Sequence, residues 1–213
     1  MSDTVNDDGS IRDHWERVYH DKAPTELSWY QRHSERSLQL IEQTGIARSA
    51  SIIDVGGGAS TLVDDLLARG FSDVAILDLS AEALTRARQR LGAGAERVKW
   101  LVADVLTTDL PANSVDLWHD RAVFHFLTDP DHRAEYIAQV RRVVRPGGHV
   151  IVATFAEDGP TQCSGLPVQR YSATELHGTF GDDFQLERSE RETHETPGGA
   201  EQRFVYCWCR YSQ

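Results

Sequence analysis

Three aspartates in the first half of the chain accompany short apolar segments. Asp54 lies in the segment 51–55, just before three consecutive glycines, while Asp78 ends the segment 73–78 and Asp104 follows the segment 97–103. Glycines let the backbone turn sharply and let a ligand approach the main chain, and the N–H groups at the start of the next helix (61–69) point toward that ligand. A carboxylate about 20 residues further on can accept hydrogen bonds from both hydroxyls of a ribose. This spacing indicates a nucleoside-containing ligand.

Two kinds of nucleotide site use a glycine-rich turn after a strand. A dinucleotide site has the pattern Gly-x-Gly-x-x-Gly, for which Gly56 and Gly58 supply the first pair while Thr61 occupies the third position. The run Asp54-Val55-Gly56-Gly57-Gly58 instead resembles the first motif of the class I S-adenosylmethionine (SAM) methyltransferases. A plain structural turn is the third alternative.

The resemblance implies a set of cofactor contacts along the first three strands. Asp54 would order the glycine turn, and Gly56 and Gly58 would let the backbone meet the methionine part of SAM. Asp78 would bind the ribose; its alternative is a charge at the N-terminus of the next helix. The adenine would then be held by Leu79, which packs on it, by Asp104, which accepts from its amino group, and by the backbone N–H of Val105. Asp104 has the alternative of capping its own loop. The product of SAM would be S-adenosylhomocysteine (SAH).

The fourth expected strand, 114–120, leads into residues that suit the methyl acceptor. In the resembling fold this strand ends beside the transferred methyl group, which places Asp120 and Arg121 near the methionine carboxylate and amine and near the acceptor. Arg121 can pair with a carboxylate in bidentate fashion. His125 could take a proton from an acceptor, with a surface or capping histidine as the alternative. We therefore predict Asp120, Arg121 and His125 as the catalytic group, with Asp120 also contacting the cofactor.

The sequence around these residues also resembles a narrower group. The run Asp-Arg-Ala-Val-Phe-His at 120–125 is similar to the Asp-Lys-Gly-Thr-Phe-Asp type of sequence in some protein-lysine methyltransferases, with the glycine and the final acid changed. The opening around Trp15 and Ser28-Trp29-Tyr30 is also similar to openings in that wider group. We expect residues 11–33 to form an aromatic lid in which Tyr30 contacts SAM; the alternative is an N-terminal helix that packs on the sheet.

The order of elements predicts the fold class. After the glycine turn, expected strands (73–78, 97–103, 114–120 and 149–155) alternate with expected helices (81–91 and 131–144), which favours a parallel sheet covered on both faces. A helix at 173–180 follows, and the strands 184–192 and 202–211, joined by Pro197-Gly198-Gly199, must form an antiparallel hairpin. By resemblance, we expect a three-layer α/β sandwich with seven strands in the order 3-2-1-4-5-7-6 and the seventh strand reversed. Residues 1–10 are expected to be a disordered tail and 11–213 a single domain.

Composition limits the classes of molecule that the protein is expected to bind. The formal net charge of −11 and the pI near 5.2 argue against nucleic acid or an anionic membrane surface, and no apolar run is long enough to span a membrane. The N-terminus is not a signal peptide, so we expect a cytoplasmic protein. Three cysteines form no closed disulfide set. A three-thiolate metalloid site at Cys163, Cys207 and Cys209 is conceivable, but we expect buried, metal-free cysteines.

These observations favour methyl transfer from SAM to a nucleophilic acceptor, which we expect to be a small molecule. A protein lysine, a thiol or a metalloid are alternative acceptors. Outside this class, an NAD-dependent oxidoreductase and a non-catalytic SAM-binding module remain alternatives. The acceptor atom and the oligomeric state are not predicted.

Overall fold

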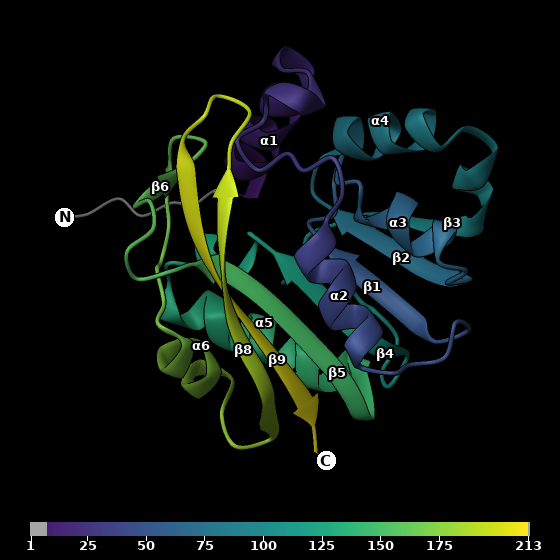
Figure 1. The fold of residues 1–213 in the computed structure, drawn as a ribbon, viewed down its shortest axis with the longest axis vertical. Coiled ribbons are helices and arrows are strands. Elements are labelled where there is room, and N and C mark those ends of the chain that lie inside the picture. The colour runs from purple at the N-terminus through teal and green to yellow at the C-terminus, as the bar shows by residue number, and fades with distance from the viewer. Residues whose placement is uncertain (1–7, 213) are drawn as a thin grey trace.

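A seven-stranded sheet forms the centre of the computed structural model, which describes residues 8–212 (Figure 1). Its strand order is β3-β2-β1-β4-β5-β9-β8. The strands are β1 (Ser51–Val55), β2 (Asp73–Asp78), β3 (Val98–Val102), β4 (Val115–Arg121), β5 (Val144–Phe155), β8 (Phe184–Glu195) and β9 (Glu201–Tyr211). The helices are α1 (Asp8–Asp21), α2 (Glu35–Gln43), α3 (Leu62–Ala68), α4 (Ala81–Leu91), α5 (Pro130–Val143) and α6 (Ala173–Phe180).

The sheet has the predicted topology. Strands β3, β2, β1, β4 and β5 are parallel, β9 runs antiparallel to β5, and β8 pairs antiparallel with β9. With β8 and β9 as the sixth and seventh main strands, the predicted order and the reversal of the last strand are confirmed. The order of the first strands follows from chain connectivity, because each crossover helix carries the chain to a neighbouring parallel strand.

Alternate residues of the strands point into two separate cores, one on each face of the sheet. Ile52, Leu117 and Ile151 pack with helices α2, α3 and α4, whereas Ile53, Trp118 and Val152 pack with α5 and α6. Figure 1 shows the same layers, with α2 in front of the sheet and α5 behind it. Strands covered on both faces explain the continuous apolar runs in the sequence.

Some local features differ from the sequence-based prediction. The short pair β6 (Gln162–Cys163) and β7 (Leu166–Pro167) and the 3₁₀ turns η1 (Pro24–Glu26) and η2 (Gly92–Arg97) were not predicted. A third 3₁₀ turn, η3 (Phe124–Phe126), follows β4. Residues 1–7 of the predicted tail lie outside the described part of the chain, but residues 8–10 already belong to α1, which corrects that end of the prediction. The longest helices here, α1 and α5, have 14 residues each, and no helix within residues 8–212 is long and apolar enough to cross a membrane.

Candidate cofactor and acceptor site

The glycine turn is packed tightly between three elements. Gly56 has φ of +65° and its N–H donates to the carbonyl of Leu77 at 2.7 Å; a Cβ placed on Gly56 would come within 1.9 Å of the Val123 side chain. Gly58 has φ of +41°, and a Cβ there would lie 2.6 Å from the Tyr19 hydroxyl and 2.9 Å from an Asp78 carboxylate oxygen. Glycine is therefore required at both positions, because the backbone is left-handed and because neighbouring groups leave no room for a side chain.

Asp54 lies behind this turn in a buried hydrogen-bond network. Its Oδ1 is 2.6 Å from Nδ1 of His119, and Nε2 of that histidine is 2.9 Å from the hydroxyl of Ser37. Oδ2 of Asp54 lies where a Cβ of Gly57 would be and has no hydrogen-bond partner. Asp54 thus lies directly behind the turn, where its Oδ2 approaches Gly57, and it is held there by His119. His119 and Ser37 were not predicted, because only the register of β1 against β4 reveals that Asp54 and His119 are neighbours.

Asp78 ends β2 and lines the larger of two cavities beside the glycine turn, which we call the main cleft. Asp78 is 7% exposed there. One carboxylate oxygen accepts from the N–H of Ser80 at 2.8 Å. Burial, helped by the nearby carboxylates of Asp54 and Glu16, raises the pKa of Asp78 to about 7. A buried carboxylate that accepts so few hydrogen bonds from the protein is suited to accept hydrogen bonds from a ligand.

Asp104 lies in the same cleft, one strand further along. Its Oδ1 accepts from the N–H of Leu106 at 2.8 Å, so it caps its own loop in the way the alternative interpretation described. The residue nevertheless lines the cleft together with Val105 and Leu79. The loop cap fixes the orientation of the carboxylate.

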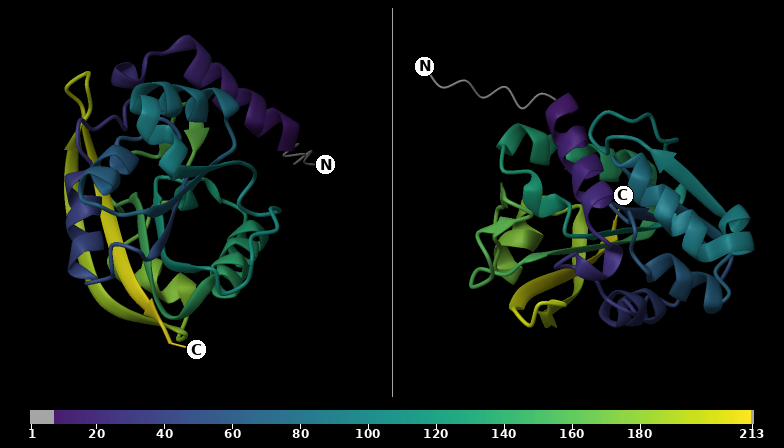
Figure 2. Two further views of the ribbon diagram at one scale, coloured as in Figure 1. Left: turned by 90° about the vertical axis from the view of Figure 1, so that its right-hand side faces the viewer. Right: turned by 90° about the horizontal axis from the view of Figure 1, so that it is seen from above.

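The main cleft has a volume of about 250 Å³ and lies at the carboxyl ends of β1, β2, β3 and β4. Its far wall is apolar and aromatic and includes Trp15, Trp29, Phe126, Leu127 and Leu166. Seen from above, α1 lies across this end of the molecule beside α4 (Figure 2). A smaller cavity, lined by Tyr30, Ser37, Asp54 and His119, shares Trp29, Gly56 and Arg121 with the cleft. This is the position at which open α/β sheets bind their ligands.

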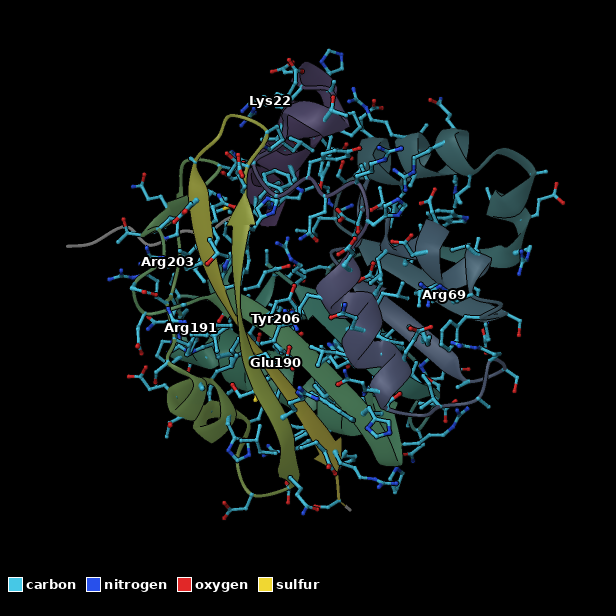
Figure 3. The ribbon with its side chains drawn as sticks, viewed as in Figure 1. Lys22, Arg69, Glu190, Arg191, Arg203 and Tyr206 are labelled. Atoms are coloured by element: carbon cyan, nitrogen blue, oxygen red, sulfur yellow. The ribbon has the colours of Figure 1, made fainter. Side chains whose placement is uncertain are left out.

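Arg121 lies where the two cavities meet. Its Nε donates to the Tyr206 hydroxyl at 3.0 Å, its Nη2 lies 3.3 Å from Oε2 of Glu192, and its guanidinium carbon lies 4.1 Å from the centre of the Phe204 ring. These partners come from β8 and β9, and Figure 3 shows Tyr206 on β9 in the reversed hairpin. The neighbouring carboxylate and phenol oxygens raise the pKa of Arg121, so the side chain keeps its charge although it is buried.

The structure contradicts the predicted position of Asp120. This side chain is fully buried and does not line either cavity. It accepts from the N–H groups of Val123 at 2.9 Å and Phe124 at 3.1 Å and from the Tyr136 hydroxyl at 2.6 Å. Asp120 therefore holds the turn after β4 from its α5 side and is not available to a cofactor or an acceptor.

His125 is also turned away from both cavities. It is fully buried, its Nδ1 accepts from the N–H of Phe155 at 3.3 Å, and its Nε2 has no hydrogen-bond partner. Burial, helped by the charge of Arg121, lowers the pKa of His125 to about 3. The predicted catalytic base is therefore wrong, and so is its surface alternative, because η3 turns the ring into the core beside Phe155.

We expect His125→Gln to change the acid sensitivity of folding without stopping methyl transfer. Histidine is neutral in the fold but gains a proton in the unfolded chain below its ordinary pKa of 6.5. Its contribution to stability is therefore complete above pH 6.5 and is lost as the pH falls toward 3. The variant should remove up to about 1.4 kcal/mol per pH unit from that slope. Urea unfolding at pH 7, 6 and 5 measures it, with the exposed His20→Gln as control; an unchanged slope would contradict the assignment.

The three cysteines do not come together. Cys163 packs with the core on the α2 side of the sheet and lines the cleft, whereas Cys207 and Cys209 pack with the core on the α5 side. The last two thiols are 3.6 Å apart, as residues two apart on one strand should be. The conceivable three-thiolate metalloid site is thus contradicted, because the sheet separates Cys163 from the other two.

Comparison with known proteins finds a methyltransferase domain and similar proteins. Residues 52–148 match the family model described as a methyltransferase domain. The EEF1A lysine methyltransferase 2 of Danio rerio is 26% identical over 65% of this chain, and the ubiquinone/menaquinone biosynthesis C-methyltransferase UbiE of Hahella chejuensis is 27% identical over 66%. The alignments cover 62% and 57% of those proteins, so the chain spans less than two thirds of their length.

A solved structure extends the likeness to nearly the whole chain. The 1,6-didemethyltoxoflavin-N1-methyltransferase of Burkholderia thailandensis, solved with 1,6-didemethyltoxoflavin and SAH, has a TM-score of 0.69, is 21% identical, and aligns over 96% of this chain and 88% of its own. The methyltransferase match includes the glycine turn, Asp78, Asp104 and β4. It favours the methyltransferase interpretation of that turn over the dinucleotide interpretation. The chain thus resembles the class I SAM-dependent methyltransferases, whose domain model matches residues 52–148, and it has the fold of a methyltransferase of known structure.

Proposed function

We propose that this protein transfers the methyl group of SAM to a small-molecule acceptor bound between the aromatic wall of the cleft and Arg121. The observation that supports this most is the cleft itself. It joins the glycine turn, Asp78 and Asp104 at the ends of adjacent strands, and it continues to Arg121 and the aromatic wall. One cavity can therefore hold a nucleoside and a second molecule next to each other.

The residues present suit SAM. Asp78 is a buried carboxylate with a raised pKa and few donors, and a ribose would supply the hydroxyl donors that the site lacks. Leu79, Asp104 and Val105 would hold the adenine, and the turn at Gly56 and Gly58 would face the methionine part. Tyr30 lines the smaller cavity next to Gly56, in keeping with a contact to that part of the cofactor.

When bound, SAM supplies a methyl group that its sulfonium already activates. The protein then needs chiefly to align the acceptor and to exclude water. Trp15 and Trp29 close the cleft with apolar rings, and their centroids are 5.9 Å apart. Arg121 would orient an acceptor that carries an anionic or polar group. Because Asp120 and His125 are turned away, we assign no protein base to the reaction.

Several features favour a small acceptor. The wall of the cleft beyond Asp104 is apolar. Arg121, which also lines the cleft, is positively charged and would repel the ammonium group of a lysine. His125, which replaces the final acid of the lysine-type sequence, is buried away from the cleft. The Hahella relative is named for the biosynthesis of ubiquinone and menaquinone, and the Burkholderia structure contains 1,6-didemethyltoxoflavin, so proteins of similar sequence or fold act on small molecules.

A protein lysine is the second candidate acceptor, because the zebrafish relative is named as a lysine methyltransferase of EEF1A and is as similar to this chain as the UbiE relative. Its alignment covers 65% of the chain. A lysine would have to bring its positive charge into the cleft that Arg121 lines.

Calorimetric titration with SAM, SAH and NAD tests the cofactor. We expect SAM and SAH to bind and NAD not to bind; binding of NAD alone would overturn the proposal. The acceptor is then tested with radiolabelled SAM, one arm containing a small-molecule extract and the other purified elongation factor 1A. Label in small molecules only supports the proposal, label in the protein favours the second candidate, and SAM binding with no label in either arm would indicate a non-catalytic module.

A further inference from the structure

Glu16 of α1 caps the N-terminus of α4. Its carboxylate accepts from the hydroxyl of Ser80 at 2.8 Å and from the N–H groups of Ala81 at 2.7 Å and Glu82 at 3.1 Å. The first N–H groups of a helix have no partner within the helix, and the positive end of the helix dipole attracts a carboxylate. These contacts lower the pKa of Glu16 despite its partial burial, so the group is charged at neutral pH.

Arg86 of α4 makes the opposite contact at the end of α1. Its guanidinium donates to the carbonyls of His20 at 3.2 Å and Lys22 at 2.6 Å, and Glu82 holds it from the preceding turn at 2.8 Å. Lys22 is labelled in Figure 3 beside the end of α1. The last carbonyls of a helix attract cations, just as its first N–H groups attract anions. Each of the two helices therefore caps a terminus of the other.

The face of α1 next to Glu16 covers the cleft. Ile11, Trp15 and Tyr19 are spaced four residues apart, so they share one helix face, and all three line the cleft. The Tyr19 hydroxyl lies where a side chain of Gly58 would be, next to Asp78. With α1 in this position, a ligand held by Asp78 and the glycine turn lies underneath Trp15 and Tyr19.

The cap of α4 also lies within the segment that holds Asp78. The N–H of Ser80 donates to Asp78, and the hydroxyl of Ser80 binds Glu16 and accepts from the N–H of Ala83 at 3.1 Å. Only residue 79 separates Asp78 from Ser80. Any movement of α1 away from the cleft must therefore break the Glu16 contacts, which lie two to four residues from Asp78.

We propose that Glu16 and Arg86 are positioning residues that fasten α1 to α4 as a closed lid and thereby control how fast the nucleoside cofactor leaves the cleft. The inference rests on the proposed function for the identity of that cofactor. The two residues touch neither cofactor nor acceptor; they act through Trp15, Tyr19 and the segment that carries Asp78.

Release of SAH, measured by stopped-flow displacement with excess SAM, tests the proposal. We expect Glu16→Ala and Arg86→Met each to speed SAH release about tenfold, and Glu16→Gln, which keeps one acceptor oxygen, to have a smaller effect. The matched controls are Asp13→Ala, an exposed carboxylate of α1, and Arg88→Met, an arginine of α4 that lies over Trp100. Equal release rates in Glu16→Ala and Asp13→Ala would overturn the proposal.

Hydrogen exchange of the unliganded protein provides a readout that does not depend on the cofactor. In Glu16→Ala and Arg86→Met, the amides of residues 10–21 should exchange about tenfold faster than in the controls, while those of β1 and β4 stay protected. Unchanged exchange in residues 10–21 would contradict the proposal. If the wild type binds no SAH, the proposed function fails, but the exchange experiment still decides whether the two helices are fastened in this way.

Discussion

Asp78→Asn should lower the affinity for SAM about 100-fold while the protein keeps its fold. Two hydrogen bonds from ribose hydroxyls to a charged acceptor contribute about 3 kcal/mol together, which corresponds to that factor. The amide keeps the oxygen that accepts from Ser80 but loses the charge and one acceptor. Calorimetric titration with SAM measures the loss. Asp73→Asn is the matched control, because Asp73 begins the same strand at the end away from the cleft. Near-normal binding in Asp78→Asn would contradict the ribose assignment.

The raised pKa of Asp78 gives this prediction a signature in pH. Only the ionised carboxylate is a full acceptor, so the affinity of the wild type for SAM should fall by up to about tenfold per pH unit below the pKa of about 7. The unfolded chain titrates near 3.8, so the folded, unliganded protein holds an extra proton between these values. The stability contribution of Asp78 is therefore lost as the pH rises from about 4 to 7. At pH 8, Asp78→Asn should bind SAM poorly yet melt no lower than the wild type.

The fold could be predicted from sequence because local signals were strong and consistent. The apolar β-branched segment 51–55 ends at a glycine turn, and Ser80 caps α4 at the predicted residue. The expected bounds of β2, α4 and α6 agree with the structure to the residue. That the residues predicted to bind the cofactor lie together followed as well, since the carboxyl ends of parallel strands meet at one edge of the sheet. Asp78, Leu79, Asp104 and Val105 all line the cleft there.

The residues facing the methyl acceptor could not be predicted, because their positions depend on side-chain directions at the end of β4 and after it. Successive residues of a strand point to opposite faces, and beyond Arg121 the chain leaves the strand with Ala122 at φ of +71°. Strand alternation points Asp120 to the α5 side and Arg121 to the cleft. The turn at Ala122 then leads into η3, which places His125 in the core. The partners of Arg121 come from β8 and β9, far along the chain, and no local pattern connects them. The same holds for Glu16, whose contacts with residues 80–82 exist only after folding.

Arg121→Met should be the most damaging substitution at the acceptor side. It leaves the Glu192 carboxylate mostly buried, and within residues 8–212 its remaining hydrogen-bond partners are Tyr206 at 3.0 Å and Gln31 at 3.1 Å. Removal of one partner from a buried ion pair costs about 3–5 kcal/mol. The loss of the contact with the Phe204 ring adds to this. We therefore expect a large fall in the urea midpoint together with a loss of methyl transfer, so the single variant alone does not separate folding from function.

The double variant Arg121→Met with Glu192→Gln makes that separation. Both charges are then absent, and the glutamine oxygen can still accept from the Tyr206 hydroxyl, so most of the lost stability should return. If Arg121 orients the acceptor, methyl transfer by the double variant stays at least about tenfold below that of the wild type, although SAM binds normally. The reason is that the guanidinium of Arg121 would have held an anionic group of the acceptor with charge-assisted hydrogen bonds. Recovery of stability and activity together would show that Arg121 serves the fold alone. In that case the acceptor must be recognised by the aromatic wall of Trp15, Trp29 and Phe126.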